Sequence, residues 1–100
     1  MPRHTTSSVF FSVYVLESFR DKNTYIGYTD YLKKRIEEHE KGLSFATKPR
    51  LPMKLIYYEA CRNREDAKRR EQYLKTTQGR RFLGLRLKEY RRQEALGTGS

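Results

Sequence analysis

Two short runs of β-branched and aromatic residues, Val9–Leu16 and Thr24–Tyr28, place the strongest constraint on how this chain can fold. Residues of these types favour extended strands. The polar segment Ser18–Asn23 between them suits a turn, so the two runs predict an antiparallel hairpin. A third run of the same character, Met53–Ala60, predicts one more strand.

The segment between the second and third strands predicts a helix followed by a loop. Asp30 is a suitable N-cap for a helix that runs to about Lys41. Gly42 stands where helices commonly end. The basic stretch 43–52, with two prolines, then forms a loop.

Two further helices are predicted after the third strand. Asn63 caps a helix that runs to about Thr76, where Gly79 breaks it. A third helix follows to about Arg92. The order ββαβαα predicts an α+β fold, a three-stranded sheet with helices packed against it.

The length of 100 residues allows a single domain. We expect this domain to span residues 9–92, with a disordered segment at 1–8 and a flexible tail at 93–100. Apolar residues make up 36% of the chain and charged residues 34%, which predicts a small core under a heavily solvated surface.

The charge balance favours a polyanionic partner. Lys and Arg number 22 against 12 Asp and Glu, and binding of such a surface to phosphates releases counterions. Cys61 is the only cysteine, which excludes an intrachain disulfide and a cysteine-rich zinc site. The sequence shows no apolar run long enough to span a membrane and no signal-peptide pattern, so we expect a cytoplasmic protein without a membrane partner.

The first predicted helix carries two polar residues on its apolar side. Leu32, Ile36 and Leu43 fall within a narrow arc at 100° per residue. His39 lies inside this arc and Arg35 at its edge, so both point toward the body of the domain. A lone histidine there is usually a hydrogen-bonded core side chain, but two cationic groups one turn apart suit a bound anion.

Glu71 is the most unusual residue of the second predicted helix. It lies between Ala67 and Leu74, which define the inward face. A buried carboxylate must be paired, neutralised or bound to a cation. Glu71 therefore either pairs with Lys75 or Arg35, or binds a metal such as Mg²⁺, for which one carboxylate is sufficient.

The hairpin brings further candidates together. Tyr25 and Gly27 share a face because strand side chains alternate, and Gly27 leaves bare backbone where a phosphate could approach. Tyr14 joins that face only if the residue numbers of two directly opposite residues in the hairpin add up to an odd number. The sequence alone does not determine this register.

A set of basic residues remains outside these motifs. Charge runs often only solvate a face, but here three separate elements contribute, with aromatic residues interspersed. We therefore expect a surface that contacts phosphates. The set comprises Lys48, Arg50, Lys54, Arg62, Arg64, Lys68, Arg69, Arg70, Arg80, Arg81, Arg86, Arg91 and Arg92. The residues that we expect to contact nucleic acid are Gly27, Lys48, Arg50, Arg70, Lys75 and Arg80.

Taken in order, the tripeptides Ser12–Tyr14 and Tyr25–Gly27, followed by Arg35, His39 and Glu71, resemble the active-site residues of the GIY-YIG nuclease superfamily. The chain is similar to its small standalone members, related to the nuclease module of the bacterial excision-repair incision subunit. The stretches Tyr25–His39 and Ala67–Lys75 match most closely. The resemblance implies a three-stranded antiparallel sheet flanked by helices, in agreement with the order above.

Three features depart from the family pattern. Ser12 replaces the glycine of the first tripeptide. The loop after the first helix has Lys48 in the region where some members have a second histidine. A downstream asparagine of some members has no clear counterpart, although Gln78 is nearby.

The resemblance implies an endonuclease that hydrolyses DNA phosphodiesters, with RNA left open, in a structure-selective role linked to repair or recombination. Glu71 would hold Mg²⁺ or Mn²⁺, and Arg35 would clamp the scissile phosphate. Tyr14 would be the general base, with Tyr25 and His39 positioning water and phosphate. Because a phenol has a pKa of about 10, we expect adjacent cations to lower the pKa of Tyr14.

Two other hypotheses remain open at this point. One is a catalytically weak or inactive module that binds nucleic acid, or an enzyme whose specificity comes from a partner protein. The other is an interaction subunit whose basic face meets an acidic protein.

Overall fold

The sheet is the organising element of the computed structural model, which describes residues 9–97. Its strands are β1 (Phe11–Ser18), β2 (Thr24–Thr29) and β3 (Met53–Cys61). They are antiparallel and ordered β2-β1-β3, so β1 is central and β2 and β3 are the edges. The predicted hairpin and third strand are both confirmed.

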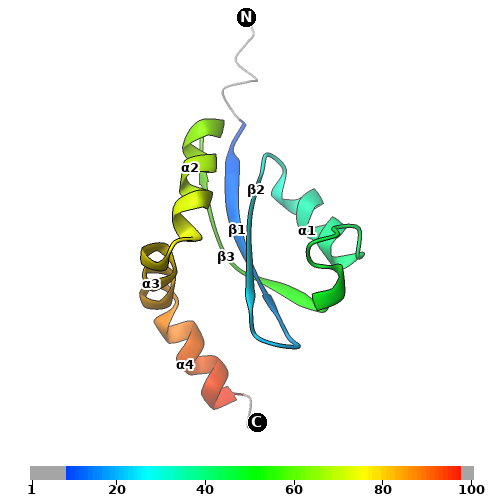
Figure 1. Cartoon of the computed structure of the whole chain (residues 1–100), viewed down its shortest axis with the longest axis vertical. Coiled ribbons are helices and arrows are strands. Elements are labelled where there is room, and N and C mark those ends of the chain that lie inside the picture. The colour runs from blue at the N-terminus through cyan, green and yellow to red at the C-terminus, as the bar shows by residue number, and fades with distance from the viewer. Residues whose placement is uncertain (1–8, 98–100) are drawn as a thin grey trace, which may run out of the picture.

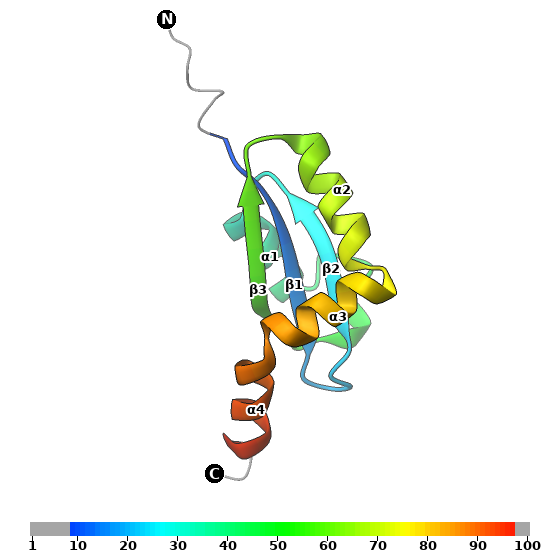
Figure 2. The same cartoon turned by 90° about the vertical axis from the view of Figure 1, so that its left-hand side faces the viewer.

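Helices cover both faces of this sheet (Figure 1). They are α1 (Leu32–Glu40), α2 (Arg64–Leu74), α3 (Thr77–Arg86) and α4 (Lys88–Gly97), with a short 3₁₀ turn, η2 (Lys48–Arg50), between α1 and β3. In Figure 2, α2 and α3 lie in front of the sheet, α1 lies behind it, and α4 extends beyond one end. The α+β class is confirmed, with one helix more than the predicted order ββαβαα.

The two faces of β1 belong to two separate cores because its side chains alternate. Val13 and Val15 point toward α2 and α3, where they pack with Ile26, Ala67, Leu74 and Leu83. Tyr14 and Leu16 point to the other side, where they pack with Met53, Leu32 and Ile36. The core on the α1 side is thus partly built from the residues that are candidates for chemistry.

The hairpin register meets the condition for Tyr14 to share a face with Tyr25 and Gly27. Tyr14 lies directly opposite Gly27, and Leu16 lies opposite Tyr25. The face on which they lie is the one covered by α1.

The start of α1 differs from the prediction, whereas its end agrees with it. Asp30 does not cap the helix: Tyr31 occupies the N-cap position and makes no side-chain capping bond. Instead the backbone N–H of Tyr31 donates to Thr29 Oγ1 at 3.1 Å. Gly42 follows the helix with φ +76°, a left-handed conformation that glycine adopts readily, and this prediction is confirmed.

The junction between α2 and α3 shows why Gly79 is needed. Asn63 caps α2 as predicted, because its Oδ1 accepts from the backbone N–H of Asp66 at 3.0 Å. Gly79 does not break a helix, however, since it lies inside the first turn of α3, and its N–H donates to the capping Thr76 Oγ1. A Cβ at position 79 would overlap the carbonyl oxygen of Tyr73, so the tight turn between the helices requires glycine.

The third predicted helix divides at Leu87, and its second part, α4, continues to Gly97. Residues 93–97, where we expected the tail to begin, are therefore helical, and the remaining terminal predictions, 1–8 and 98–100, lie outside the described residues. Buried Glu17 attaches α4 to β1: it accepts a hydrogen bond from Tyr90 Oη at 3.2 Å and forms an ion pair with Arg91. None of the helices within 9–97 is long and apolar enough to cross a membrane.

Candidate active site

Tyr14 is the centre of a polar cluster between the sheet and α1. It lies in the middle of the central strand and its side chain is buried. Its phenol oxygen is 2.9 Å from His39 Nε2, and it accepts a longer hydrogen bond from Arg35 Nε at 3.4 Å. Three residues separated in sequence thus meet at one oxygen atom.

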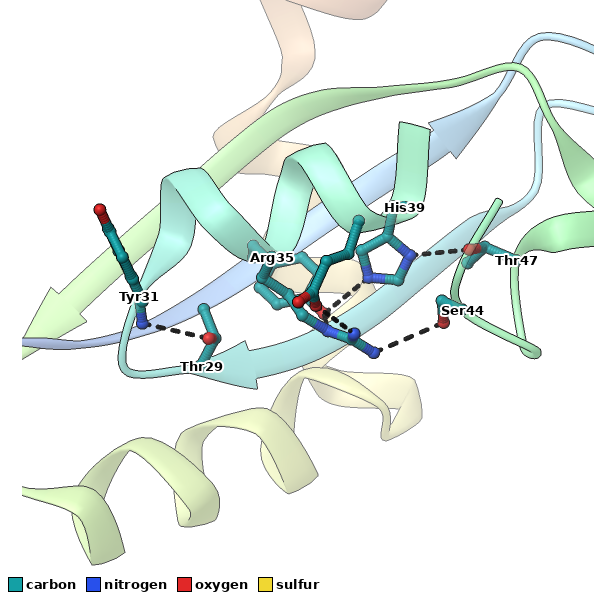
Figure 3. A network of polar contacts seen from close by, with 8 residues as sticks. Thr29, Tyr31, Arg35, His39, Ser44 and Thr47 are labelled. Atoms are coloured by element: carbon teal, nitrogen blue, oxygen red, sulfur yellow. Dashed lines mark hydrogen bonds and ion pairs between the residues drawn. The ribbon is translucent and has the colours of Figure 1, made fainter. Parts of the chain in front are cut away.

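His39 connects Tyr14 to the loop that follows α1. Its ring is 1% exposed and lies beside the rings of Tyr14 and Tyr25, at centroid distances of 5.6 and 5.3 Å. Its Nδ1 is 2.7 Å from Oγ1 of the buried Thr47 (Figure 3). The inward orientation predicted for His39 is confirmed.

The surroundings of His39 favour its neutral form. Burial lowers the pKa of the imidazole, and the positive charge of Arg35 lowers it further, against a smaller opposing effect of Glu38. A neutral imidazole has one nitrogen that donates and one that accepts. His39 is therefore able to accept a proton at neutral pH.

Arg35 is held in place by three partners. Besides Tyr14, its Nη1 pairs with Glu38 Oε1 at 2.9 Å and its Nη2 donates to Ser44 Oγ at 3.4 Å (Figure 3). The hydrogen bond to Glu38 raises the pKa of Arg35, which keeps it charged. About a third of the side chain, 33%, remains exposed, so an anion can approach it.

The phenol of Tyr14 is harder to ionise than expected. Burial raises the pKa of Tyr14 to about 12, because its effect exceeds that of the hydrogen bond from Arg35. The adjacent cation Arg35 does lower this pKa, as expected, but one partly exposed arginine does not offset the loss of hydration, so the net shift is upward. At pH 7 only about one molecule in 10⁵ would carry the phenolate.

The surroundings of Gly27 differ from the bare backbone that we expected there. A Cβ at position 27 would lie 2.6 Å from the phenol oxygen of Tyr14 and 3.1 Å from Tyr25 Cε2. The space beside this glycine is therefore filled by the Tyr14 ring and is not bare backbone open to a phosphate. Gly27 allows the phenol of Tyr14 to reach His39 and Arg35.

Glu71 comes from the opposite layer of the molecule. Its side chain is 16% exposed, which agrees with the predicted inward orientation, and its Oε2 pairs with Lys75 Nζ at 2.9 Å. Within residues 9–97, no hydrogen bond or ion pair joins Glu71 to Arg35 or to the Tyr14 cluster. The pairing with Lys75 is thus one of the two ion pairs considered from the sequence.

The described residues fit a metal site that is built around a single carboxylate. Across the described part of the chain, no group of three or more His, Cys, Asp or Glu side chains could hold a metal ion. Mg²⁺ needs only one or two carboxylates, because waters and substrate phosphate complete its octahedron. The half-buried carboxylate of Glu71 suits such a site, with Lys75 as the group to be displaced.

The predicted nucleic-acid contacts divide into two groups. Arg70 makes a bidentate ion pair with Glu59, at 2.9 and 3.1 Å, and stacks on the ring of Phe82, while Lys75 is paired with Glu71. These two cations already have carboxylate partners, so the geometry does not favour them as phosphate ligands. Lys48, Arg50 and Arg80 form no ion pair with any described residue.

Three polar residues of the cluster were not expected from the sequence. Ser44 and Thr47 are buried and hydrogen-bond to Arg35 and His39. Their contacts depend on how the loop folds back, and no local pattern shows this. Glu38 could have been found, because it stands three residues after Arg35 on the same helix.

The comparison with known families identifies the family over most of the chain. The sequence model of the GIY-YIG catalytic domain matches residues 10–94. The chain therefore belongs to the GIY-YIG family.

Individual relatives carry the name UPF0213, which states no activity. A UPF0213 protein of Clostridium perfringens is 41% identical over 64 residues, covering 63% of this chain and 68% of that protein. One of Streptococcus pneumoniae serotype 4 is 42% identical over 64 residues, covering 63% of this chain and 64% of that protein. The solution NMR structure of a UPF0213 protein from Bacillus halodurans is 31% identical, with a TM-score of 0.47, and covers 74% of this chain and 81% of that one.

Proposed function

We propose that this protein is an endonuclease that hydrolyses phosphodiester bonds in DNA with a divalent metal ion held by Glu71. The observation that carries the proposal is the chain of contacts from Tyr14 through His39 to Thr47, with Arg35 at the same phenol oxygen. This arrangement supplies a proton acceptor beside a fixed cation, the two groups that hydrolysis of a phosphodiester by water requires. Membership of the GIY-YIG family supports the assignment.

The pKa of Tyr14 determines how the proton must move. With a pKa of about 12, the phenolate is too rare to wait for substrate at neutral pH. Tyr14 therefore gives its proton to His39 Nε2, 2.9 Å away, as its oxygen accepts a proton from the attacking water. This step requires the tautomer in which Nδ1 of His39 donates to Thr47 Oγ1, 2.7 Å away, because that tautomer leaves Nε2 free to accept.

Arg35 provides fixed positive charge at the reacting phosphate. Its guanidinium is oriented by Glu38 and Ser44 before substrate arrives. A phosphate oxygen that approaches its exposed side competes with Glu38 for the same N–H groups. Positioned cations of this kind stabilise the charge that develops in the transition state.

Glu71 is the residue that would hold Mg²⁺ or Mn²⁺. A metal ion held there would supply Lewis-acid stabilisation of the negative charge that develops during hydrolysis. Lys75 must release the carboxylate of Glu71 for this to occur, and the pair is accessible because the Lys75 side chain is 43% exposed. Removal of Glu71 should therefore abolish metal-dependent activity without removing a core side chain.

The test is cleavage of fluorescent single-stranded, duplex and branched DNA in Mg²⁺, in Mn²⁺ and in EDTA. Wild type is compared with Glu71→Ala and with Glu65→Ala, which removes an exposed carboxylate from the same helix. Metal-dependent cutting that is lost in Glu71→Ala and kept in Glu65→Ala supports the proposal. Preference for a branched substrate would support the role in repair or recombination. If only RNA of the same sequences were cut, RNA and not DNA would be assigned as the substrate.

A second candidate function is a binding module with a silent site, and the ion pair between Glu71 and Lys75 favours it. In that case the carboxylate serves the helix and no metal displaces Lys75. Wild type would then bind DNA in every buffer and cut none of the substrates. Glu71→Ala would bind as tightly as wild type.

A further inference from the structure

Two arginines from opposite faces of the sheet meet at Thr24, the first residue of the edge strand β2. Arg50 ends η2, and its Nη2 donates to the backbone oxygen of Thr24 at 3.5 Å. Arg80 belongs to α3, and its Nη1 donates to Thr24 Oγ1 at 3.4 Å. Figure 2 shows α3 in front of the lower part of β2, on the side away from α1.

The arginines form the walls of an open cleft of about 600 Å³. The residues that line it are Lys22, Asn23, Thr24, Arg50, Arg80 and Arg91. Four of the six are cations. The cleft is therefore a concentrated positive region at the end of β2.

Most of this positive charge is not neutralised by the protein. Arg91 is paired with Glu17, but Lys22, Arg50 and Arg80 form no ion pair within residues 9–97. One nearby carboxylate opposes them: the pKa of Asp21 is lowered, chiefly by a hydrogen bond from the Asn23 backbone and to a smaller extent by the charge of Arg50. The sum of the charges around the cleft remains positive.

The hydrogen bonds to Thr24 leave both guanidinium groups with unused donors. Each guanidinium has five N–H groups, and the contacts of Arg50 and Arg80 at Thr24 are long and go to neutral oxygens. A phosphate group would replace these weak contacts with charge-assisted ones. The site is thus oriented for an anion before one binds.

We propose that this cleft binds a phosphate of the substrate strand that flanks the scissile phosphate, an inference that rests on the proposed nuclease function. Thr24 is three residues from Gly27, the residue that lies opposite Tyr14, and at the usual rise of a strand this is about 10 Å along β2. A nucleic-acid strand advances about 3.4 Å per phosphate along a duplex axis. The cleft therefore holds a phosphate at most about three nucleotides from the bond to be cut, with the strand following the outer edge of β2.

Contacts of this kind position a strand without reading its bases. The cleft then sets the length of strand needed on one side of the cut and the salt dependence of binding. A phosphate partner would also account for the absence of carboxylate partners at Arg50 and Arg80 among the described residues, whereas Arg70 and Lys75 have such partners.

The test measures binding without metal, so that it does not depend on cleavage. A fluorescein-labelled single-stranded DNA of 12 nucleotides (about four times the proposed spacing) is titrated in EDTA at several salt concentrations, and anisotropy gives the dissociation constant. The double variant Arg50→Gln/Arg80→Gln is compared with Arg81→Gln, which removes an exposed charge from the same helix. The slope of log K against log salt should become shallower by about 0.7 for each phosphate that the double variant no longer binds, and should change less in Arg81→Gln.

Two further arms keep the proposal falsifiable. Arg80→Lys should retain the wild-type slope, which distinguishes removal of charge from misfolding. Inorganic phosphate, added at constant ionic strength, should compete far more weakly than unlabelled DNA; equal competition would assign a site for free anions and overturn the proposal. An unchanged slope in the folded double variant would also overturn the proposal, even if the wild type cuts DNA. A changed slope would support the phosphate site even if the wild type cuts no DNA, so the two proposals can fail separately.

Discussion

Replacement of Gly27 by alanine tests the geometry at the centre of the site. The added Cβ would lie 2.6 Å from the phenol oxygen of Tyr14, whereas ordinary contacts of this kind begin near 3.4 Å. The phenol must therefore retreat by about 0.8 Å. Its hydrogen bond to His39, 2.9 Å long in the wild type, would stretch beyond the useful range.

The expected cost combines two effects of similar size. Overpacking of a well-packed core costs about 1–3 kcal/mol, and loss of a buried hydrogen bond costs about 1–3 kcal/mol. The two overlap, because one movement of Tyr14 relieves the first and causes the second. We expect Gly27→Ala to lower the free energy of unfolding by about 2–4 kcal/mol.

Urea unfolding measures this cost. Far-UV circular dichroism is the signal, because the chain has no tryptophan whose fluorescence could report unfolding. Gly84→Ala is the matched control, because a Cβ there meets nothing within 4 Å and the residue lies inside α3. The control should be more stable than wild type by about 0.5–1 kcal/mol. In a Tyr14→Leu background, which removes the outer ring atoms, Gly27→Ala should lose most of its cost.

The reasoning is refuted if Gly27→Ala unfolds at the urea midpoint of the wild type. It is also refuted if the cost is the same in the Tyr14→Leu background, because the clash would then not involve the phenol. Loss of cleavage without any loss of stability would place the effect on substrate binding instead.

Three further perturbations test other parts of the structure. Arg91→Gln leaves the carboxylate of Glu17, which is 1% exposed, without its ion-pair partner. Because Arg91 itself is 43% exposed, we expect the free energy of unfolding in urea to fall by only about 1–3 kcal/mol. Adding Glu17→Gln should restore most of this loss. The pKa of Tyr14 is raised from 10.0 to about 12, so the protonated phenol stabilises the fold below pH 10, and this stabilisation is lost as the pH rises toward 12. Over this range the free energy of unfolding should fall by about 2–3 kcal/mol more in wild type than in Tyr14→Phe. Equal losses in the two proteins would contradict the burial argument. The pKa of His39 is lowered by burial, so the folded protein loses stability as the pH falls below about 6.5, where the unfolded chain takes up a proton first. For the same reason kcat/KM should decline only below pH 6.5. A decline centred above this pH would exclude His39 as the proton acceptor.

Local patterns in the sequence were sufficient for much of the framework. The hairpin, the third strand, the cap at Asn63 and the left-handed Gly42 follow from the preferences of neighbouring residues. The inward orientation of His39 also follows, because the period of a helix determines which residues share a face. Each of these features depends on residues only a few positions apart.

Two glycine predictions failed because the space around each glycine is set by another helix or strand. Gly79 was interpreted as a helix breaker, but its need arises from the backbone of the preceding helix. Gly27 was interpreted as an opening for phosphate, but the Tyr14 ring from the neighbouring strand fills that space. A glycine signals that space is required and does not identify what occupies it.

The sequence by itself determined on which elements the candidate site residues lie and which of them share a face, because strand alternation and helical period are local. Only the tertiary structure decided the register that sets Tyr14 opposite Gly27, the closure of Thr47 onto His39, and the meeting of Arg50 and Arg80 at Thr24. It also decided that the pKa of Tyr14 rises instead of falling, since burial depends on every segment that packs around the phenol.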